Sequence, residues 1–302
     1  MKFNFFKNTW RLLVTSFNHF IDFNGLKLSA ALSYYAVFSI GPLLIVVISL
    51  AGLFFGRMAV EGKVYYEISG LVGSDTALQI QNIIRNTQES SHGKLGGIVG
   101  TVILILGASG VFSEIQSSIN YLWSVPSPKK RAFLIALFRK LISFSLLIAV
   151  AFLLMVSLTA NAVLDILSDQ LKNLFSSSLI DLFYFINLAM ITLVISTLFM
   201  LVFKILPNST ISWKHSFLGA LITSILFLIG KFIIGFYLGH SKIGVTYGTT
   251  ASIVILMLWI YYSSIILYFG ACYTAAFAAH QGYPIRGRIP GEKREIEKGI
   301  NA

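Results

Sequence analysis

A stripe of polar residues runs along the otherwise apolar segment 97–123. Its members recur every three or four residues, so on a helix they would share one face: Ser109, Ser113, Gln116, Ser117 and Asn120. Glu114 lies beside this stripe. Because an unpaired polar group is costly in lipid, the face must meet other helices, water or a polar substrate. The segment is long enough to cross a bilayer, so the stripe is a candidate site inside a membrane.

Glu114 is the only acidic residue deep within a predicted span. An ionised acid near the bilayer centre costs about 2.5–3.5 kcal/mol, so this carboxyl group should be paired, protonated or in contact with water. One interpretation is a proton- or cation-linked site, or a polar groove for a lipid headgroup. The other is an interhelix hydrogen bond that fixes the packing.

Lys231 is the lysine that could pair with Glu114 inside the membrane. At a rise of 1.5 Å per residue, Glu114 should lie about 15 Å and Lys231 about 25 Å from the inner ends of their helices. A lysine at that depth more readily extends toward the outer surface. Lys231 is therefore either an anchor at the outer interface or, if the helices tilt, the partner of Glu114.

Two further spans are polar over part of their length. The first carries Ser33, Tyr34 and Tyr35 ahead of Pro42, which either kinks the helix for packing or breaks it beside a cavity. The sixth carries two adjacent tyrosines near its middle. We expect the first, second and sixth spans to line a shared polar cavity. The candidate residues for transport through it are Ser33, Tyr34, Tyr35, Pro42, Ser109, Ser113, Glu114, Gln116, Asn120, Lys231, Tyr261 and Tyr262.

Few residues could support catalysis or metal binding. The 5 histidines are scattered over different segments, and Cys272 is the 1 cysteine. No serine, histidine and acid share the depth and spacing of a catalytic group. We therefore expect no enzyme, no metal site, no cofactor and no nucleic-acid partner.

The composition predicts the structural class. Of 302 residues, 56% are hydrophobic and 12% are charged, which is about half the charged share of a soluble domain. The long apolar runs predict an all-α polytopic membrane protein. Its six spans are expected at about 28–55, 95–123, 141–164, 179–203, 217–238 and 250–277.

Lysine and arginine counts predict the orientation. Of 23 such residues, 16 lie in the segments that would be inside if the N-terminus is inside, and 6 lie in the outer segments. The positive-inside rule then places both termini in the cytoplasm. Lys129, Lys130 and Arg131, in one inner loop, would contact the anionic headgroups of membrane lipids.

The segments outside the spans have patterns of their own. Residues 1–27 predict an amphipathic helix that either lies in the membrane interface or packs on the cytoplasmic ends of the bundle. Its apolar face would consist of Phe6, Trp10, Leu13, Phe17 and Phe20. A short helix on the outer side is predicted within 56–94. The polar, basic tail 278–302 is expected to be loosely ordered.

Several stretches, taken together, resemble one family. They are Ala30 to Pro42, Val111 to Trp123, and a long C-terminal stretch that begins Leu206-Pro-Asn-Ser-Thr-Ile-Ser-Trp213 and ends Leu267-Tyr-Phe-Gly-Ala271. Their order and spacing resemble the YihY / virulence factor BrkB family. The resemblance implies a bacterial inner-membrane protein with six spans and no settled activity. An older label of that family, ribonuclease BN, would require clustered metal ligands, which scattered histidines do not provide.

This chain also departs from the family pattern. Leu228 and Cys272 stand where members often carry acidic residues, which puts any proton-carrying role of those acids in doubt for this chain.

Two functions fit the sequence. One is a transporter or lipid-translocating protein with a polar intramembrane cavity. The other is a non-transporting scaffold or envelope assembly factor, in which neighbouring helices fill the polar stripe.

Overall fold

The computed structural model describes residues 2–39, 110–125, 177–240 and 251–287, together with single positions between 62 and 82. Within these residues the regular elements are helices, with one isolated β-bridge between Ser209 and Gly287. The labelled helices are α1 (Lys2–Asp22), α7 (Ser177–Ile205), α8 (Trp213–His240) and α10 (Ala251–His280). Two further helical segments cover 25–39 and 110–122.

Three of the described helices are long and apolar enough to cross a bilayer: Leu188–Ile205, Trp213–Ile234 and Ile253–His280. They lie in α7, α8 and α10, and they confirm the helical membrane-protein class expected from the composition. Continuous apolar sequence produces such helices because every backbone group is bonded within the segment, as a lipid environment requires. The ends of α7, α8 and α10 lie within four residues of the predicted bounds 179–203, 217–238 and 250–277.

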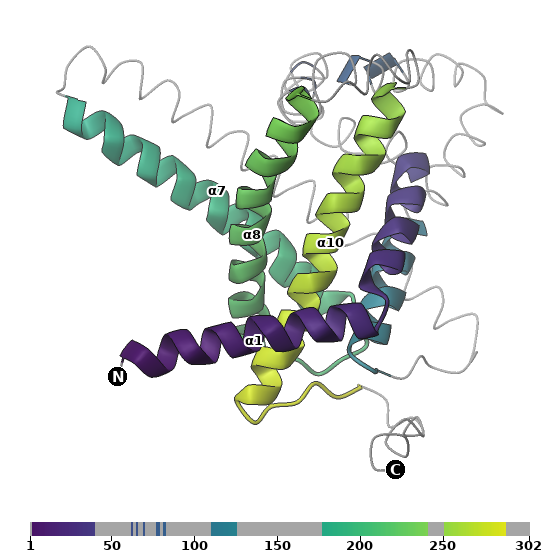
Figure 1. The fold of residues 1–302 in the computed structure, drawn as a ribbon, viewed down its shortest axis with the longest axis vertical. Helices are drawn as coiled ribbons and strands as arrows, with labels where there is room; N and C mark the ends of the chain where they lie inside the picture. The colour runs from purple at the N-terminus through teal and green to yellow at the C-terminus, as the bar shows by residue number, and fades with distance from the viewer. Residues whose placement is uncertain are drawn as a thin grey trace, which may run out of the picture.

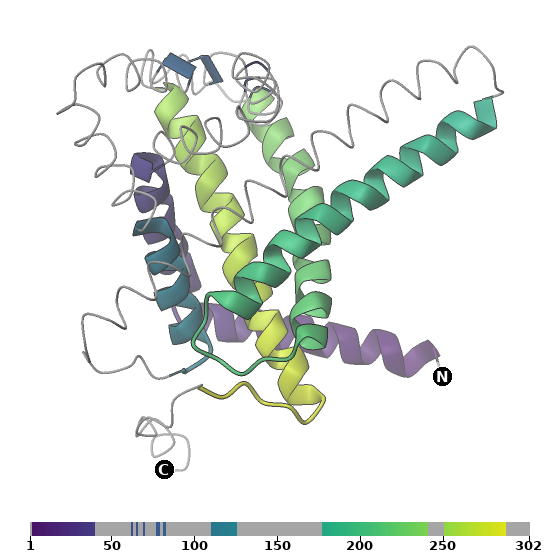
Figure 2. The same cartoon turned by 180° about the vertical axis from the view of Figure 1, so that it is seen from behind.

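The helices form a bundle with one crosswise helix at its end (Figure 1). α8 and α10 run side by side, while α7 crosses α8 and then extends away from the bundle, as both views show (Figure 2). The helices 25–39 and 110–122 lie next to each other along the opposite side of α10. α1 lies across the end of the bundle from which the C-terminal segment of α10 emerges, so both ends of the described chain lie at that end.

α8 and α10 approach closely because a glycine on each helix receives a threonine from the other. A Cβ atom at Gly219 would overlap the side chain of Thr274, and a Cβ atom at Gly270 would overlap that of Thr223. Each threonine hydroxyl also donates to the carbonyl oxygen four residues earlier, at 2.8 Å for Thr223 and 2.7 Å for Thr274. This reciprocal contact buries the hydroxyls without an unpaired polar group, which is how small residues bring membrane helices together.

The buried core lies where the helix 110–122, the end of α7 and α10 meet. Ile119, Phe203 and Tyr268 are fully buried there. Trp123 joins the three elements because its indole Nε1 donates to Ala271 O of α10 at 2.8 Å and its ring lies 6.5 Å from that of Phe203. The core therefore fixes the second half of the polar stripe against α10.

α1 presents a different face to the bundle from the one that the sequence pattern suggests. Ser16 and Phe20 are buried, and the ring of Phe20 meets Phe269 of α10 edge-on at 6.4 Å. Trp10 and Phe17 remain exposed on a second apolar face. The periodicity groups Trp10, Phe17 and Phe20 on one face, whereas the structure buries Phe20 against α10 and leaves Trp10 and Phe17 exposed.

The C-terminal tail is more ordered at its start than expected. α10 continues to His280, and Thr210 N donates to Arg286 O at 2.9 Å beside the bridge between Ser209 and Gly287. Several predicted features lie outside the described residues. These are most of the first and second spans, the whole of the third, Pro42, Ser109, the loop that carries Lys129, Lys130 and Arg131, and nearly all of the helix expected within 56–94.

Candidate functional site

The polar stripe of the helix 110–122 contacts the loop that follows α7. Gln116 Nε2 donates to Leu206 O at 2.6 Å, and Asn208 N donates to Asn120 Oδ1 at 2.9 Å. Both side chains satisfy backbone groups where the chain turns between α7 and α8. This part of the stripe therefore holds two neighbouring elements in place.

Replacing Asn120 with alanine should lower the free energy of unfolding by about 1–3 kcal/mol, because the amide of Asn208 would lose its acceptor inside the protein. Unfolding in mixed micelles, followed by circular dichroism, measures this change. Ser117→Ala is the control, since Ser117 lies on the same helix and is exposed; its effect should stay within about 0.5 kcal/mol. Equal effects of the two substitutions would contradict the assignment.

Glu114 forms a small polar cluster with groups of its own helix and α10. Ser118 Oγ donates to Glu114 Oε1 at 3.1 Å, and the carboxyl group is half-buried. The Tyr268 hydroxyl lies near both Ser118 and Glu114, with neither at hydrogen-bond geometry. Within the described part of the chain Glu114 forms no ion pair. The cluster thus combines an acid that has no ion pair among the described residues with two neighbouring hydroxyl groups.

Tyr268 is unusual because its side chain is 0% exposed and its hydroxyl has no hydrogen-bond partner within the described residues. A buried polar group without a partner costs about 1–3 kcal/mol, and such groups call for an explanation in terms of strain, catalysis or a missing ligand. The Tyr268 hydroxyl neighbours Ser118, whose own hydroxyl donates to the Glu114 carboxyl group. The cluster can therefore stabilise negative charge on Glu114 or a cation or proton bound there.

The other candidate residues of the first two spans lie at the surface or bond within their own helix. Ser113 is exposed. Tyr35 approaches Gly110, with 3.8 Å between its Cδ1 atom and the position of a Cβ at that glycine. Tyr34 is exposed and its ring meets that of Tyr35 edge-on at 6.0 Å. Ser33 is buried and donates to Ala30 O at 2.8 Å, so its hydroxyl is used within its own helix.

The candidate residues from the fifth and sixth spans lie elsewhere. Tyr262 fits against Gly230 of α8, where a Cβ atom would overlap its hydroxyl. Tyr261 is half-buried, and no hydrogen bond joins it to Glu114 in the described residues. Lys231 is exposed and forms no ion pair with the described residues. The structure thus brings Glu114 together with Ser118 and Tyr268, and it leaves Lys231 apart.

Sequence reasoning did not select Ser118 or Tyr268. The signal was present, because Ser264 and Tyr268 follow Tyr261 at spacings of three and four residues and so continue its helical face. Tyr268 lies in the stretch Leu267-Tyr-Phe-Gly-Ala271, which served only to support the family resemblance. Its burial and missing hydrogen bond depend on packing and could not be read from the spacing.

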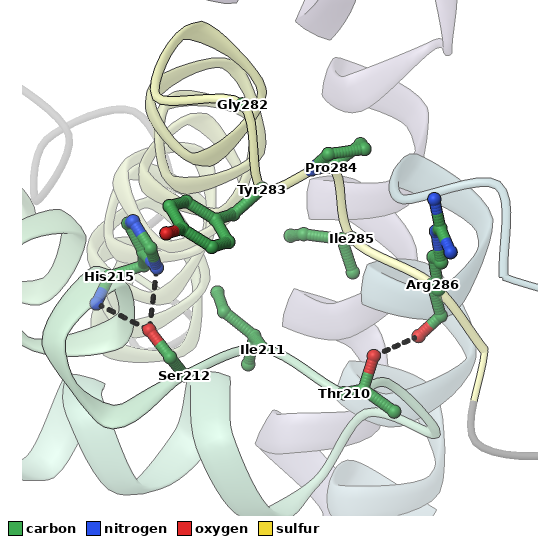
Figure 3. Close-up of a pocket in the computed structure, with 9 residues that line it drawn as sticks. All are labelled: Thr210, Ile211, Ser212, His215, Gly282, Tyr283, Pro284, Ile285 and Arg286. Carbon is green, nitrogen blue, oxygen red and sulfur yellow. Dashed lines mark hydrogen bonds between the residues drawn. The ribbon is translucent and has the colours of Figure 1, made fainter.

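A second polar region lies at the end of the bundle near α1 (Figure 3). Here the loop before α8 and the segment after α10 enclose a pocket of about 250 Å³. Ser212 Oγ lies 2.5 Å from His215 Nδ1 and also accepts a hydrogen bond from His215 N, which caps the first turn of α8. His215 Nε2 lies 3.0 Å from Gln281 Oε1, and the Tyr283 ring lies beside the imidazole. Both ring nitrogens of His215 are engaged, so this region ties the end of α10 to the start of α8.

The described residues contain no group of three or more histidine, cysteine, aspartate or glutamate side chains that could hold a metal ion. Cys272 is buried in the core beside Tyr268 and Ala271. The chemistry available at the Glu114 cluster is therefore that of one carboxyl group and two hydroxyl groups.

The sequence of this chain is similar to those of known membrane proteins. A sequence profile described as "Virulence factor BrkB" matches residues 16–295. A UPF0761 membrane protein of Stenotrophomonas maltophilia (strain R551-3) is 28% identical over 283 residues, which cover 90% of this chain and 62% of that protein. This chain therefore spans less than two thirds of the length of the Stenotrophomonas relative.

Two other relatives are matched over more of their length. A UPF0761 membrane protein of Tolumonas auensis is 25% identical, with 87% of this chain and 84% of that protein covered. One from Vibrio vulnificus (strain YJ016) is 24% identical, with 95% and 89% covered. No solved structure shows a significant match. The names of these relatives describe membrane proteins and state no activity.

Proposed function

This chain belongs to the virulence factor BrkB family of membrane proteins, and we propose that it is a transporter of the bacterial inner membrane that moves lipids or other amphiphilic molecules. The observation that carries the proposal is the Glu114 cluster. An acidic side chain inside a helical bundle, without an ion pair among the described residues and beside the buried, unpartnered hydroxyl of Tyr268, is costly to maintain for packing alone.

The proposed topology has six spans with both termini in the cytoplasm. The distribution of lysine and arginine supports it, because 16 of 23 lie in the segments assigned to the inside. Its second support is the position of α1 and of the segment after α10 at one end of the bundle (Figure 1). An even number of spans places the two termini on the same side of the membrane.

The proposed mechanism uses the change in charge of one carboxyl group. When Glu114 is ionised it attracts a proton or a cation, and the Ser118 hydroxyl donates to it. When Glu114 is neutral, the cluster is less costly inside the membrane. Such a change would alter the contacts between the helix 110–122 and α10 and could link transport to a proton or cation.

An amphiphilic substrate is favoured by the position of the polar stripe. Ser113 and Ser117 are exposed, so the stripe reaches the surface of the bundle. A headgroup could follow these hydroxyls past Glu114 while its acyl chains stay in the lipid. This arrangement would lower the cost of moving a polar headgroup through the hydrocarbon region.

Lipid movement in proteoliposomes tests the proposal. The full chain is reconstituted with a phospholipid whose headgroup carries a fluorophore, and dithionite reports the fraction of label that reaches the outer leaflet. Wild-type protein should accelerate movement above protein-free vesicles, and Glu114→Gln should reduce that acceleration at least ten-fold, to about 10% or less. Asp22→Asn is the matched control, because it removes an exposed acid of α1 and should leave the rate unchanged.

Two results would refute the proposal. One is movement no faster than in protein-free vesicles when circular dichroism shows folded protein. The other is an equal rate for wild type and Glu114→Gln.

The second candidate function is a membrane scaffold or envelope assembly factor. The contacts of Gln116 and Asn120 with the 206–208 loop favour it, because they show neighbouring elements filling part of the polar stripe. This alternative expects Glu114→Gln to keep full activity and bulky residues at Gly110 to disrupt folding.

A further inference from the structure

An apolar groove lies between α7 and α8. These two helices cross and then diverge where α7 extends away from the bundle (Figure 2). Its volume is about 390 Å³. The lining combines side chains from both helices: Leu188, Ala189, Thr192, Leu193, Ser196, Phe217 and Leu221. Leu188, Leu193 and Phe217 are all exposed. On a membrane-spanning pair of helices, exposed side chains of this kind face hydrocarbon rather than water.

The few polar atoms at this groove are already satisfied. Ser196 Oγ lies 2.6 Å from Ser224 Oγ, which joins α7 to α8 at the crossing point. Ser196 also donates to Thr192 O, and Thr192 to Leu188 O, both at 2.7 Å. The groove therefore offers an apolar ligand methyl and methylene groups and requires no polar partner.

The end of the groove that lies near the start of α8 carries positive charge. Lys214 precedes Phe217 by three residues and Leu221 by seven, so all three lie on one face of α8. Lys214 is exposed and forms no ion pair or hydrogen bond with any described residue. Lys204, at the end of α7, lies over the Trp213 ring at 5.5 Å. Tryptophan and lysine together are typical of the level of the headgroups.

We propose that this groove binds an anionic phospholipid, with one acyl chain between α7 and α8 and the phosphate group at Lys214. The chemistry of the site favours such a lipid. The apolar side chains of the groove match an acyl chain, and the ammonium group of Lys214, which has no ion pair among the described residues, matches a phosphate group. The site does not involve Glu114 and extends beyond the proposed transport function.

Native mass spectrometry of the full chain in detergent tests this site. Phosphatidylglycerol and phosphatidylcholine of equal chain length are titrated, and the affinity of each is measured. Wild type should bind phosphatidylglycerol more tightly. Lys214→Gln should weaken phosphatidylglycerol binding about five-fold, as expected for one charge near the headgroups, and leave phosphatidylcholine binding unchanged. Ala189→Trp, which fills the groove, should weaken the binding of both lipids.

The control variant is Lys231→Gln, because Lys231 is also an exposed lysine of α8 but lies ten positions beyond Leu221, away from the end of the groove next to Lys214. It should bind both lipids as wild type does. Equal affinity of wild type for the two lipids, an equal loss in Lys231→Gln and Lys214→Gln, or unchanged binding in Ala189→Trp would each overturn the proposal. Thermal unfolding confirms that each variant is folded. Because the readout is binding, its failure leaves the Glu114→Gln transport result standing.

Discussion

Trp123→Ala is expected to lower the free energy of unfolding by about 3–5 kcal/mol, the range for removing a buried tryptophan from a packed core. The Trp123 side chain is only 6% exposed. It packs against Phe203 of α7, and its indole N–H bonds to Ala271 O of α10 at 2.8 Å. Truncation therefore leaves a cavity at the point where three elements meet. Reversible unfolding in mixed micelles measures the change.

Trp10→Ala provides the matched comparison, because Trp10 is 69% exposed on α1. Its effect on the unfolding free energy should stay below about 0.5 kcal/mol. Trp123→Phe should fall between the two, since it keeps most of the apolar volume and loses the hydrogen bond to Ala271. A loss below about 1 kcal/mol for Trp123→Ala would show that this side chain does not hold the three elements together.

Gly270→Ala is expected to destabilise the protein by about 1–3 kcal/mol, the usual cost of inserting a methyl group into a packed interface. The added Cβ would overlap the hydroxyl of Thr223 and lie 2.8 Å from its Cβ. To relieve this overlap α8 and α10 would have to separate. Such a separation would also disturb the contact between Gly219 and Thr274, which joins the same two helices. The same unfolding titration measures the loss.

A second substitution tests whether overlap with Thr223 is the cause. The double variant Gly270→Ala with Thr223→Gly should be more stable than Gly270→Ala alone. The glycine at position 223 of α8 would then leave room for the alanine methyl group at position 270 of α10. Gly110→Ala is the control, since its nearest neighbour would be Tyr35 Cδ1 at an ordinary 3.8 Å, and alanine favours a helix over glycine. Equal losses for Gly270→Ala and Gly110→Ala would contradict the close packing of α8 and α10.

The bounds of the apolar helices could be predicted to within a few residues. The lengths of α7, α8 and α10 follow from runs of apolar sequence, because a spanning helix must satisfy its backbone internally and present apolar side chains all round. The family also follows from local stretches of sequence. Both results depend on residues that are near one another in the chain.

The candidate site was only partly predictable. Glu114 stood out from the sequence alone, because an acid within an apolar run is rare. Its cluster with Ser118 and Tyr268 did not, since Tyr268 lies 154 positions further along the chain. Lys231, the partner that charge alone suggests, is exposed on α8. Charge identifies which groups could pair, but helix packing determines which of them meet.

α1 shows the same division between sequence and tertiary structure. Its sequence determined that a helix with large apolar residues would form, and periodicity placed Phe17 and Phe20 on one face. Only the packing of α1 across the end of α10 separated them, with Phe20 buried against Phe269 and Phe17 left exposed. Periodicity predicts which residues lie on the same side of one helix. The element that covers that side is decided by contacts between segments far apart in the chain, because burial depends on the whole bundle.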